Sequence, residues 1–299
     1  MRIDFIANPN SGRGLGPRRA GEIASILARR GHDCRIRLGR SRQDAIEWAK
    51  EASKVADRLV VIGGDGSLSA VVDGLPVDAP PIALAPLGTS NMLATELKLP
   101  RRPFGTAKLV ESENQLCLDT GIVSYTAAND LKETLTQRSF LVWDFGLGAE
   151  LMRRMNEKRD GPIHKTDYLP LLGKIIKNWA PTAQRVIADG EDLGEFEFGV
   201  ISGMRTYGIK AFRLGKAEYT DGLWEIYLFP KINLATTSFL AAASATGRLT
   251  QIPGVVHRKV KTVQVMGLNT APLQIDGDYV GTTSVEFSLN APPLSLLLP

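Results

Sequence analysis

The stretch VVIGGDGSLSAVVDGL, residues 60–75, joins an apolar run to an amphipathic segment through three glycines and one aspartate. The apolar residues before Gly63 are typical of a strand covered on both faces, and the residues after Ser67 fit a helix. In α/β proteins, ligands bind where a parallel strand turns into a helix. Glycine at such a turn lets the backbone approach a phosphate, because no Cβ stands in the way. The stretch therefore predicts an α/β fold with a ligand site at this turn.

The first 110 residues repeat the alternation of strand and helix. Short apolar runs predict strands at residues 2–7, 34–38, 58–62 and 81–85. One helix is expected to begin at Pro17 and to stop at Gly31, and a second to begin at Ser41, where Asp44 three residues later makes a near capping box. Successive βαβ units imply right-handed crossovers and a parallel sheet. We therefore expect an α/β domain with a parallel sheet over residues 1–114.

The pattern changes after about residue 115. Strand-like segments with alternating polarity predict a mainly antiparallel β domain over residues 115–290. Helices interrupt it at about 149–158, 167–179 and 233–246. The tail PPLSLLLP is expected to return to the first domain as a last strand, so residues 291–299 are assigned there.

The composition is typical of a globular protein with a core of its own. Hydrophobic residues make up 43% and charged residues 23% of the 299 residues, and the formal net charge is +4. The two cysteines offer neither a disulfide framework nor ligand spacing, and we expect both to be buried and inert. The N-terminus does not resemble a signal peptide and the longest apolar run is too short to span a bilayer, so we expect a cytoplasmic protein.

Asp65 is the one acid among the glycines of the opening stretch. A carboxylate repels bare phosphate, so its place is explained if Mg²⁺ lies between the two or if Asp65 accepts a proton from an attacking hydroxyl. The alternative is a tight turn in which Asp65 only caps the following helix.

Two further loops leave neighbouring strands in the same way. APLGTSNMLATEL, residues 85–97, carries Gly88, Thr89 and Asn91, and ANPNSGRGLG, residues 7–16, carries polar residues at 8, 11 and 13. Neither the P-loop pattern nor the dinucleotide GxGxxG pattern is present. Loops of this kind on one edge of a sheet predict a shared polyphosphate site.

Four motifs in order, NPNSG, GGDGS, PLGTSNMLA and the late IDGDYV at 275–280, resemble the diacylglycerol kinase catalytic-domain superfamily over nearly the whole chain. That superfamily includes bacterial lipid kinases and sphingosine kinases, with NAD kinases as distant relatives. The resemblance implies a Rossmann-like, nucleotide-binding N-terminal domain, a C-terminal β-sandwich domain for the lipid substrate, and ATP and Mg²⁺ in the cleft between them. The implied activity is transfer of the γ-phosphate of ATP to a lipid hydroxyl, of diacylglycerol or a sphingoid base, in phospholipid biosynthesis.

The motifs also imply roles for single residues. Asp65 and Asp276 would be catalytic, with one of them the base for the acceptor hydroxyl, and Asp65 would also hold Mg²⁺. Glu150, in GLGAEL, stands at an acidic position associated with the lipid headgroup. Asp221 matches the second acid of a DDG motif that holds a structural Mg²⁺ in some members. The implied nucleotide contacts are Asn8, Ser11, Arg13, Gly63, Gly64, Gly66, Ser67, Gly88, Thr89, Asn91 and Asp278.

The chain departs from the family pattern at four positions. Ser67 stands where threonine is common, which keeps the hydroxyl, and Ser69 replaces a usual asparagine. Met92 stands where many bacterial diacylglycerol kinases have an aspartate, although sphingosine kinases also lack it. Thr220 replaces the first acid of the DDG motif, which weakens the prediction of a structural metal.

Two alternatives therefore stay open. The first is a kinase of a soluble substrate related to NAD kinase, against which PLGTSN and the late DGD argue. The second is a homologue that binds lipid or nucleotide without catalysis, which Met92 and Ser69 leave open. The expected partner is a lipid substrate at the inner membrane surface, reached transiently; no nucleic acid is expected, and a homodimer is left open.

Overall fold

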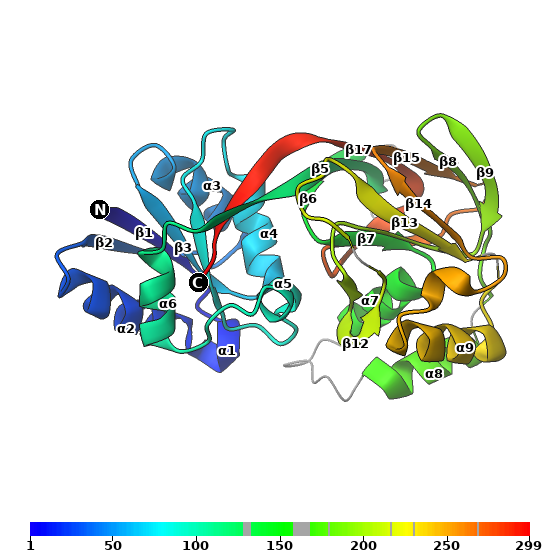
Figure 1. Ribbon diagram of the computed structural model, residues 1–299, viewed down its shortest axis with the longest axis horizontal. Helices are drawn as coiled ribbons and strands as arrows, with labels where there is room; N and C mark the ends of the chain where they lie inside the picture. Colours follow the sequence, from blue (N-terminus) through cyan, green and yellow to red (C-terminus); the bar gives the residue numbers. More distant parts are fainter. Residues whose placement is uncertain (128–132, 158–167, 179, 216, 230, 268) are drawn as a thin grey trace. The chain divides into compact units, whose positions relative to one another are not determined.

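The computed structural model of the chain describes residues 1–127, 133–157, 168–178, 180–215, 217–229, 231–267 and 269–299. The chain divides into two compact units (Figure 1). The first comprises Met1–Leu118 and Pro292–Pro299, and the second comprises Asp119–Ala291. Each unit is described in turn.

The first unit contains a parallel sheet, as its apolar runs predict. Strands β1 (Arg2–Ala7), β2 (Asp33–Leu38), β3 (Arg58–Gly63) and β4 (Ile82–Pro86) lie in the order β2-β1-β3-β4. The last five residues of β1 and of β3 and all of β4 are buried, which explains why these strands read as continuous apolar runs. The end of the long strand β17 (Asp278–Leu297) adds to β4, where Leu296 pairs with Ile82.

Helices cover both faces of this sheet. α2 (Gly16–Ala28) packs with α6 (Pro103–Val110), whereas α3 (Arg42–Ala52) packs with α4 (Asp65–Asp73); two short helices, α1 (Ser11–Gly14) and α5 (Met92–Glu96), complete the unit. The capping box predicted at Ser41 and Asp44 is present at the start of α3. The connection from β1 to β2 runs toward one edge of the sheet, whereas the connections from β2 to β3 and from β3 to β4 run toward the other edge. Because each crossover is right-handed, α2 lies on one face of the sheet and α3 and α4 lie on the other. The position between β1 and β3, from which the chain continues in opposite directions, is a topological switch point, where open α/β sheets bind ligands.

The second unit is mainly antiparallel, also as predicted. One layer runs β14-β13-β10-β7-β16-β17, and β17 continues into a second layer with β5, β6, β15, β8 and β9. The strands are β5 (Gln115–Ala127, whose first residues belong to the first unit), β6 (Thr134–Ser139), β7 (Val142–Phe145), β8 (Gln184–Ala188), β9 (Glu191–Phe196), β10 (Phe198–Ser202), β13 (Trp224–Phe229), β14 (Val256–Val260), β15 (Thr262–Met266) and β16 (Pro272–Ile275), with β11 (Thr206–Tyr207) and β12 (Ile209–Arg213) forming a separate hairpin.

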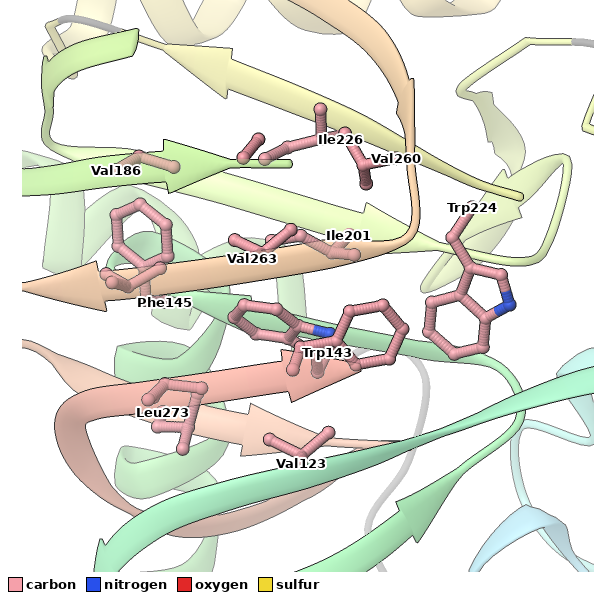
Figure 2. Packing of buried hydrophobic residues seen from close by; sticks show 14 of the residues in the cluster. Val123, Trp143, Phe145, Val186, Ile201, Trp224, Ile226, Val260, Val263 and Leu273 are labelled. Carbon is pink, nitrogen blue, oxygen red and sulfur yellow. The ribbon is translucent and has the colours of Figure 1, made fainter. Parts of the chain in front are cut away.

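The core of this unit lies between the two layers (Figure 2). Trp143 and Trp224 from the first layer contact Phe287 from the second, with ring centroids 5.7 and 5.0 Å apart. Val123, Val186 and Val263 close the core from the second layer. Two antiparallel layers around one apolar core form the predicted sandwich.

Among the described residues of the second unit, three α-helices, α7 (Leu147–Glu157), α8 (Tyr168–Asn178) and α9 (Leu234–Ala245), and one 3-10 turn, η2 (Leu249–Gln251), lie between the strands. Residues 158, 167 and 179, which the predicted helices included, lie outside the described residues. Among the helices that the structure describes, none has the length and apolar character needed to cross a bilayer. One expectation is wrong: Cys34 is only half-buried and Cys117 is exposed, because Cys117 lies on a strand with one solvated face.

Candidate active site

Three polar loops leave β1, β3 and β4 at the same edge of the first unit's sheet. Asn8, directly after β1, donates from Nδ2 to Ser67 Oγ at 3.2 Å, and its backbone N–H donates to the Ile62 carbonyl at 3.1 Å. Ser11 lies next to Gly63, because a Cβ built on Gly63 would be 3.5 Å from Ser11 Oγ. The structure therefore brings the first and second loops together at the switch point between β1 and β3.

The second and third loops touch through glycine. A Cβ on Gly88 would lie 2.6 Å from the Cα of Gly64, and a Cβ on Gly64 would lie 3.0 Å from the Cα of Gly88. Leu87 also donates its backbone N–H to the Gly63 carbonyl at 2.8 Å. Glycine is required at 88, because backbone occupies the space that a side chain would need, whereas a Cβ at 64 would fit only if the neighbouring backbone moved by a few tenths of an ångström.

Asp65 joins the same two loops. Its Oδ2 accepts the Met92 N–H at 2.7 Å and its Oδ1 accepts the Leu93 N–H at 3.3 Å. Asp65 thus binds the first turn of α5, a helix that begins 27 residues later in the chain. Its own helix, α4, begins at Asp65 with Gly64 as the N-cap residue and has no side-chain cap. The simple alternative, in which Asp65 caps the helix that follows it, does not describe this geometry.

Asn91 shapes the third loop from within. The residue is buried and left-handed (φ 49°), and its side chain accepts the Gly88 N–H at 2.9 Å and donates to the Gly88 carbonyl at 2.5 Å. Asn91 therefore holds the loop's conformation. Among the predicted nucleotide contacts in these loops, Arg13, Gly66 and Thr89 are exposed to solvent.

The residues at this edge fit a divalent cation with a polyphosphate. The half-buried Asp65 carboxylate accepts the Met92 and Leu93 N–H groups and supplies oxygen, the ligand type that Mg²⁺ prefers. Mg²⁺ is commonly held by one or two carboxylates together with phosphate oxygens. The N-terminus of α4 and the glycine backbone offer N–H donors and positive potential to phosphate.

Asp276, the other predicted catalytic residue, lies in the second unit between β16 and β17. It is 4% exposed and left-handed (φ 51°). Oδ1 accepts hydrogen bonds from Ser139 Oγ at 2.9 Å and from the Leu141 and Val142 N–H groups at 3.0 Å, and Oδ2 accepts one from the Phe140 N–H at 3.2 Å. Burial raises the pKa of Asp276 to about 7, although these four hydrogen bonds lower it.

Two other predicted residues of the second unit differ in their surroundings. Asp278 is half-buried and starts β17. Glu150, on α7, is 3% exposed and accepts two hydrogen bonds from Arg153 and one from Arg154, each at 2.7 Å. Burial raises the pKa of Glu150, but the hydrogen bonds and charges of the two arginines together outweigh it and hold the pKa below its usual value. Glu150 is therefore a carboxylate whose oxygens are already bound by two guanidinium groups.

Asp221 does not meet the requirements of a metal ligand. Its Oδ2 is 2.6 Å from Lys259 Nζ, and its Oδ1 accepts the Leu223 N–H at 3.1 Å. Over the part of the chain that the structure describes, no three His, Cys, Asp or Glu side chains are grouped as metal ligands. The donor set around Asp221 therefore does not fit a structural Mg²⁺.

A polar cluster in the second unit was not predicted from the sequence. Asp144 of β7 is fully buried and accepts hydrogen bonds from Tyr207 Oη at 2.7 Å and from Gln274 Nε2. Gln274 Oε1 in turn accepts the Gly277 N–H at 2.7 Å, so the cluster reaches the DGD turn. Burial raises the pKa of Asp144 to about 7, although hydrogen bonds from Tyr207, Gln274 and the Ala149 backbone lower it. The single acid inside the apolar run FLVWDF was the sequence signal for it.

Asp144→Asn is expected to change the pH dependence of stability. The pKa of Asp144 is about 7 in the folded chain and near 4 when unfolded, so between these values the folded chain binds the extra proton and wild-type stability falls as pH rises. The variant lacks this loss. Its free energy of unfolding relative to wild type should rise from pH 4 to pH 7, by up to about 4 kcal/mol, and then level off.

Urea unfolding followed by fluorescence at several pH values measures this difference. Asp276 titrates in both proteins and cancels. Asp192→Asn is a control of opposite sign, because the hydrogen bond from Arg185 lowers the pKa of Asp192. A difference between Asp144→Asn and wild type that stays constant with pH would show that Asp144 is ionised throughout.

One groove in the described structure lies away from all predicted site residues. It encloses about 450 Å³ on the second unit and is lined mainly by polar side chains of β15 and β17, among them Thr262, Gln264 and Glu286. None of the residues that the motifs mark as functional lines it.

Comparison with known proteins agrees with the motifs. Residues 2–123 match the family model of the diacylglycerol kinase catalytic domain. A diacylglycerol kinase of Bacillus subtilis (strain 168) is 24% identical over 290 residues, which cover 96% of this chain and 92% of that protein.

Two solved structures share the fold. The crystal structure of a proposed diacylglycerol kinase from Bacillus anthracis (strain Sterne) aligns with a TM-score of 0.80 at 19% identity, covering 100% of this chain and 95% of that one. Yeast NADH kinase, solved with NADH, aligns with a TM-score of 0.57 at 12% identity, covering 100% and 84%. The predicted resemblance is confirmed: residues 2–123 match the diacylglycerol kinase catalytic domain, and nearly the whole chain is similar in sequence and fold to kinases of that superfamily.

Proposed function

We propose that this protein is an ATP-dependent lipid kinase that phosphorylates the hydroxyl group of a neutral lipid such as diacylglycerol. The observation that supports this most is the meeting of three loops at one edge of the parallel sheet, where Asp65 of one loop binds the backbone of another. The family match of residues 2–123 supports kinase chemistry, and the names of the relatives support the acceptor.

In the proposed reaction the acceptor oxygen forms a bond to the γ-phosphorus of ATP, and the bond from that phosphorus to the bridging oxygen of ADP breaks. The acceptor proton passes to a carboxylate. We assign this role to Asp276, because a carboxyl with a pKa of about 7 is matched to proton transfer near neutral pH. Its Oδ2 is the oxygen that would take the proton, since it accepts one hydrogen bond whereas Oδ1 accepts three.

The loops of the first unit bind and orient the nucleotide in this proposal. The backbone at Gly64 and Gly66 and the N-terminus of α4 donate to phosphate oxygens. Ser67, with its hydroxyl oriented by Asn8, adds a further polar contact. Asp65 would hold Mg²⁺, which when bound neutralises the charge of the phosphates. Because Asp65 also binds the start of α5, it fixes the second and third loops relative to each other.

Glu150 favours a neutral acceptor over a sphingoid base. The ammonium group of a sphingoid base needs an available carboxylate, but both oxygens of Glu150 are bound by Arg153 and Arg154. Arg153 also pairs with Glu157, so the cluster is already balanced in charge. A cationic substrate would have to displace an arginine, whereas the hydroxyl and ester groups of a diacylglycerol can accept hydrogen bonds from one.

The test is transfer of labelled phosphate from ATP in the presence of Mg²⁺, with diacylglycerol, monoacylglycerol and sphingosine in mixed micelles and with NAD in solution. We expect labelled product with the neutral glycerolipids and little with sphingosine or NAD. Labelled NADP would favour the soluble-substrate kinase. ATP or lipid binding without any product would favour the non-catalytic homologue. The proposal also places the protein transiently at a membrane surface, which sedimentation with diacylglycerol-containing vesicles tests.

A further inference from the structure

The edge formed by β13 and β14 in the second unit carries a lysine surrounded by acids. Lys259 of β14 pairs in register with Glu225 of β13. Its Nζ lies 2.6 Å from Asp221 Oδ2, in the turn that leads into β13. The side chain of Asp221 is 20% exposed and that of Lys259 is 41% exposed, so the pair lies at the boundary of the protein and is partly shielded from water.

Several carboxylates share this neighbourhood. The hydrogen bond to Asp221 raises the pKa of Lys259, and the charges of Asp221, Glu225 and Glu218 raise it further. Burial raises the pKa of Asp119, and the negative charge of Asp221 adds to the effect. Asp119 Oδ2 accepts the Gly222 N–H at 2.7 Å, and His257 Nε2 contacts Glu225 Oε2. Lys259 is therefore the ammonium group that balances a crowded set of acids at this turn.

The family resemblance implies a structural Mg²⁺ at this turn in some members, but in this chain the matching acid, Asp221, is paired with Lys259. A divalent cation needs about six oxygen ligands and would repel an ammonium group held 2.6 Å from one of them. Threonine at 220 removes one of the two acids of the motif. The lysine ammonium group is a compact positive charge with three hydrogen-bond donors, and it can neutralise a carboxylate where a metal ion would otherwise do so.

We propose that the Lys259 ammonium group replaces a structural divalent cation, so that the turn at 219–223 is held to β14 without a metal. The folded second unit should then be indifferent to chelators. Removing the lysine charge should take away the cation that Asp221 pairs with and should create a weak site for a divalent cation. This inference concerns stability and does not depend on the proposed kinase activity.

All proteins in this experiment carry Asp65→Asn, which removes the candidate cation ligand of the first unit. The protein with Lys259 and Lys261 unchanged, referred to below as wild type, is compared with Lys259→Gln, Lys259→Arg and the matched control Lys261→Gln. Lys261 is exposed and follows β14 directly, and its side chain makes no ion pair among those in the described structure. Thermal unfolding is followed in EDTA and in millimolar CaCl₂ or MgCl₂, and calcium binding is measured by titration calorimetry.

We expect wild type, Lys259→Arg and Lys261→Gln to unfold at the same temperature in EDTA and in calcium. Lys259→Gln should unfold about 2–4 °C lower in EDTA, recover at least half of that loss in calcium, and show saturable calcium binding that the other proteins lack. A fall of the wild-type melting temperature on chelation would overturn the proposal. So would a Lys259→Gln protein as stable as wild type, or one whose lost stability no divalent cation restores.

Discussion

Asp65→Asn is expected to lower ATP-dependent lipid phosphorylation by roughly 10³-fold or more while leaving the first unit folded. Asparagine keeps one oxygen that can accept the N–H of Met92 or Leu93, so the tie to α5 is weakened and not lost. The charge that would hold Mg²⁺ is removed. The loss of one capping bond should cost about 1 kcal/mol, far too little to unfold the chain.

Asp57→Asn is the matched control for this variant. Asp57 is exposed, lies just before β3 and also accepts a backbone N–H, from Arg2 at 2.7 Å. It stands at the amino ends of the strands, whereas Asp65 follows their carboxyl ends. Asp57→Asn should therefore keep full activity. Steady-state kinetics with circular dichroism measure both variants, and an Asp65→Asn protein with ordinary turnover would exclude a cation site at this loop.

Asp276→Asn and Asp276→Ala are expected to separate the two roles that the structure gives this residue. Alanine leaves the Leu141 and Val142 N–H groups, among others, without acceptors in a buried place and should destabilise the second unit by about 3–5 kcal/mol. Asparagine can keep Oδ1 as an acceptor for three of the four donors, so it should fold. It cannot accept a proton near neutral pH, and kcat should fall roughly 10²–10⁴-fold.

Asp189 offers the control for Asp276. It also precedes a glycine, is left-handed (φ 49°) and accepts consecutive N–H groups, from Lys261 at 3.0 Å and Thr262 at 2.8 Å. Asp189→Asn should therefore share the loss of one hydrogen bond and keep its activity. Denaturant unfolding and kcat are measured on each protein. If Asp276→Asn turns over as fast as Asp189→Asn, then Asp276 serves only to join its turn to residues 139–142.

The local features of this fold were predictable because they depend on neighbours in the sequence. Continuous apolar runs gave the parallel strands, and the Ser41 and Asp44 spacing gave a capping box that is present. The alternation after residue 115 indicated antiparallel strands. The domain boundaries that we placed at 114 and 290 fall one residue before β5 and inside β17, whereas the compact units change at Leu118 and Ala291.

The contacts that define the site were not predictable, because their partners are far apart in the chain. The backbone partners of Asp65 come 27 and 28 residues later, and those of Asp276 about 135 residues earlier. The motif marked Asp221 as a metal ligand, yet Lys259, 38 residues away, holds it. Asp144 was not predicted as a site residue, because only the fold brings Tyr207 and Gln274 close enough to donate hydrogen bonds to it.

The backbone contact between Gly64 and Gly88 has a consequence for how these loops can evolve. The backbone of each glycine lies where a side chain on the other glycine would have to lie, so a change at one position affects what the other can accept. Residue 88 cannot gain a side chain unless the two loops move apart, and residue 64 can gain one only if the backbone at Gly88 moves by a few tenths of an ångström. Such a separation would also strain the hydrogen bond that the Met92 N–H donates to Asp65. Library selections that vary the two loops separately should therefore recover glycine at 88, with little tolerance for other residues at 64, whatever the lipid offered.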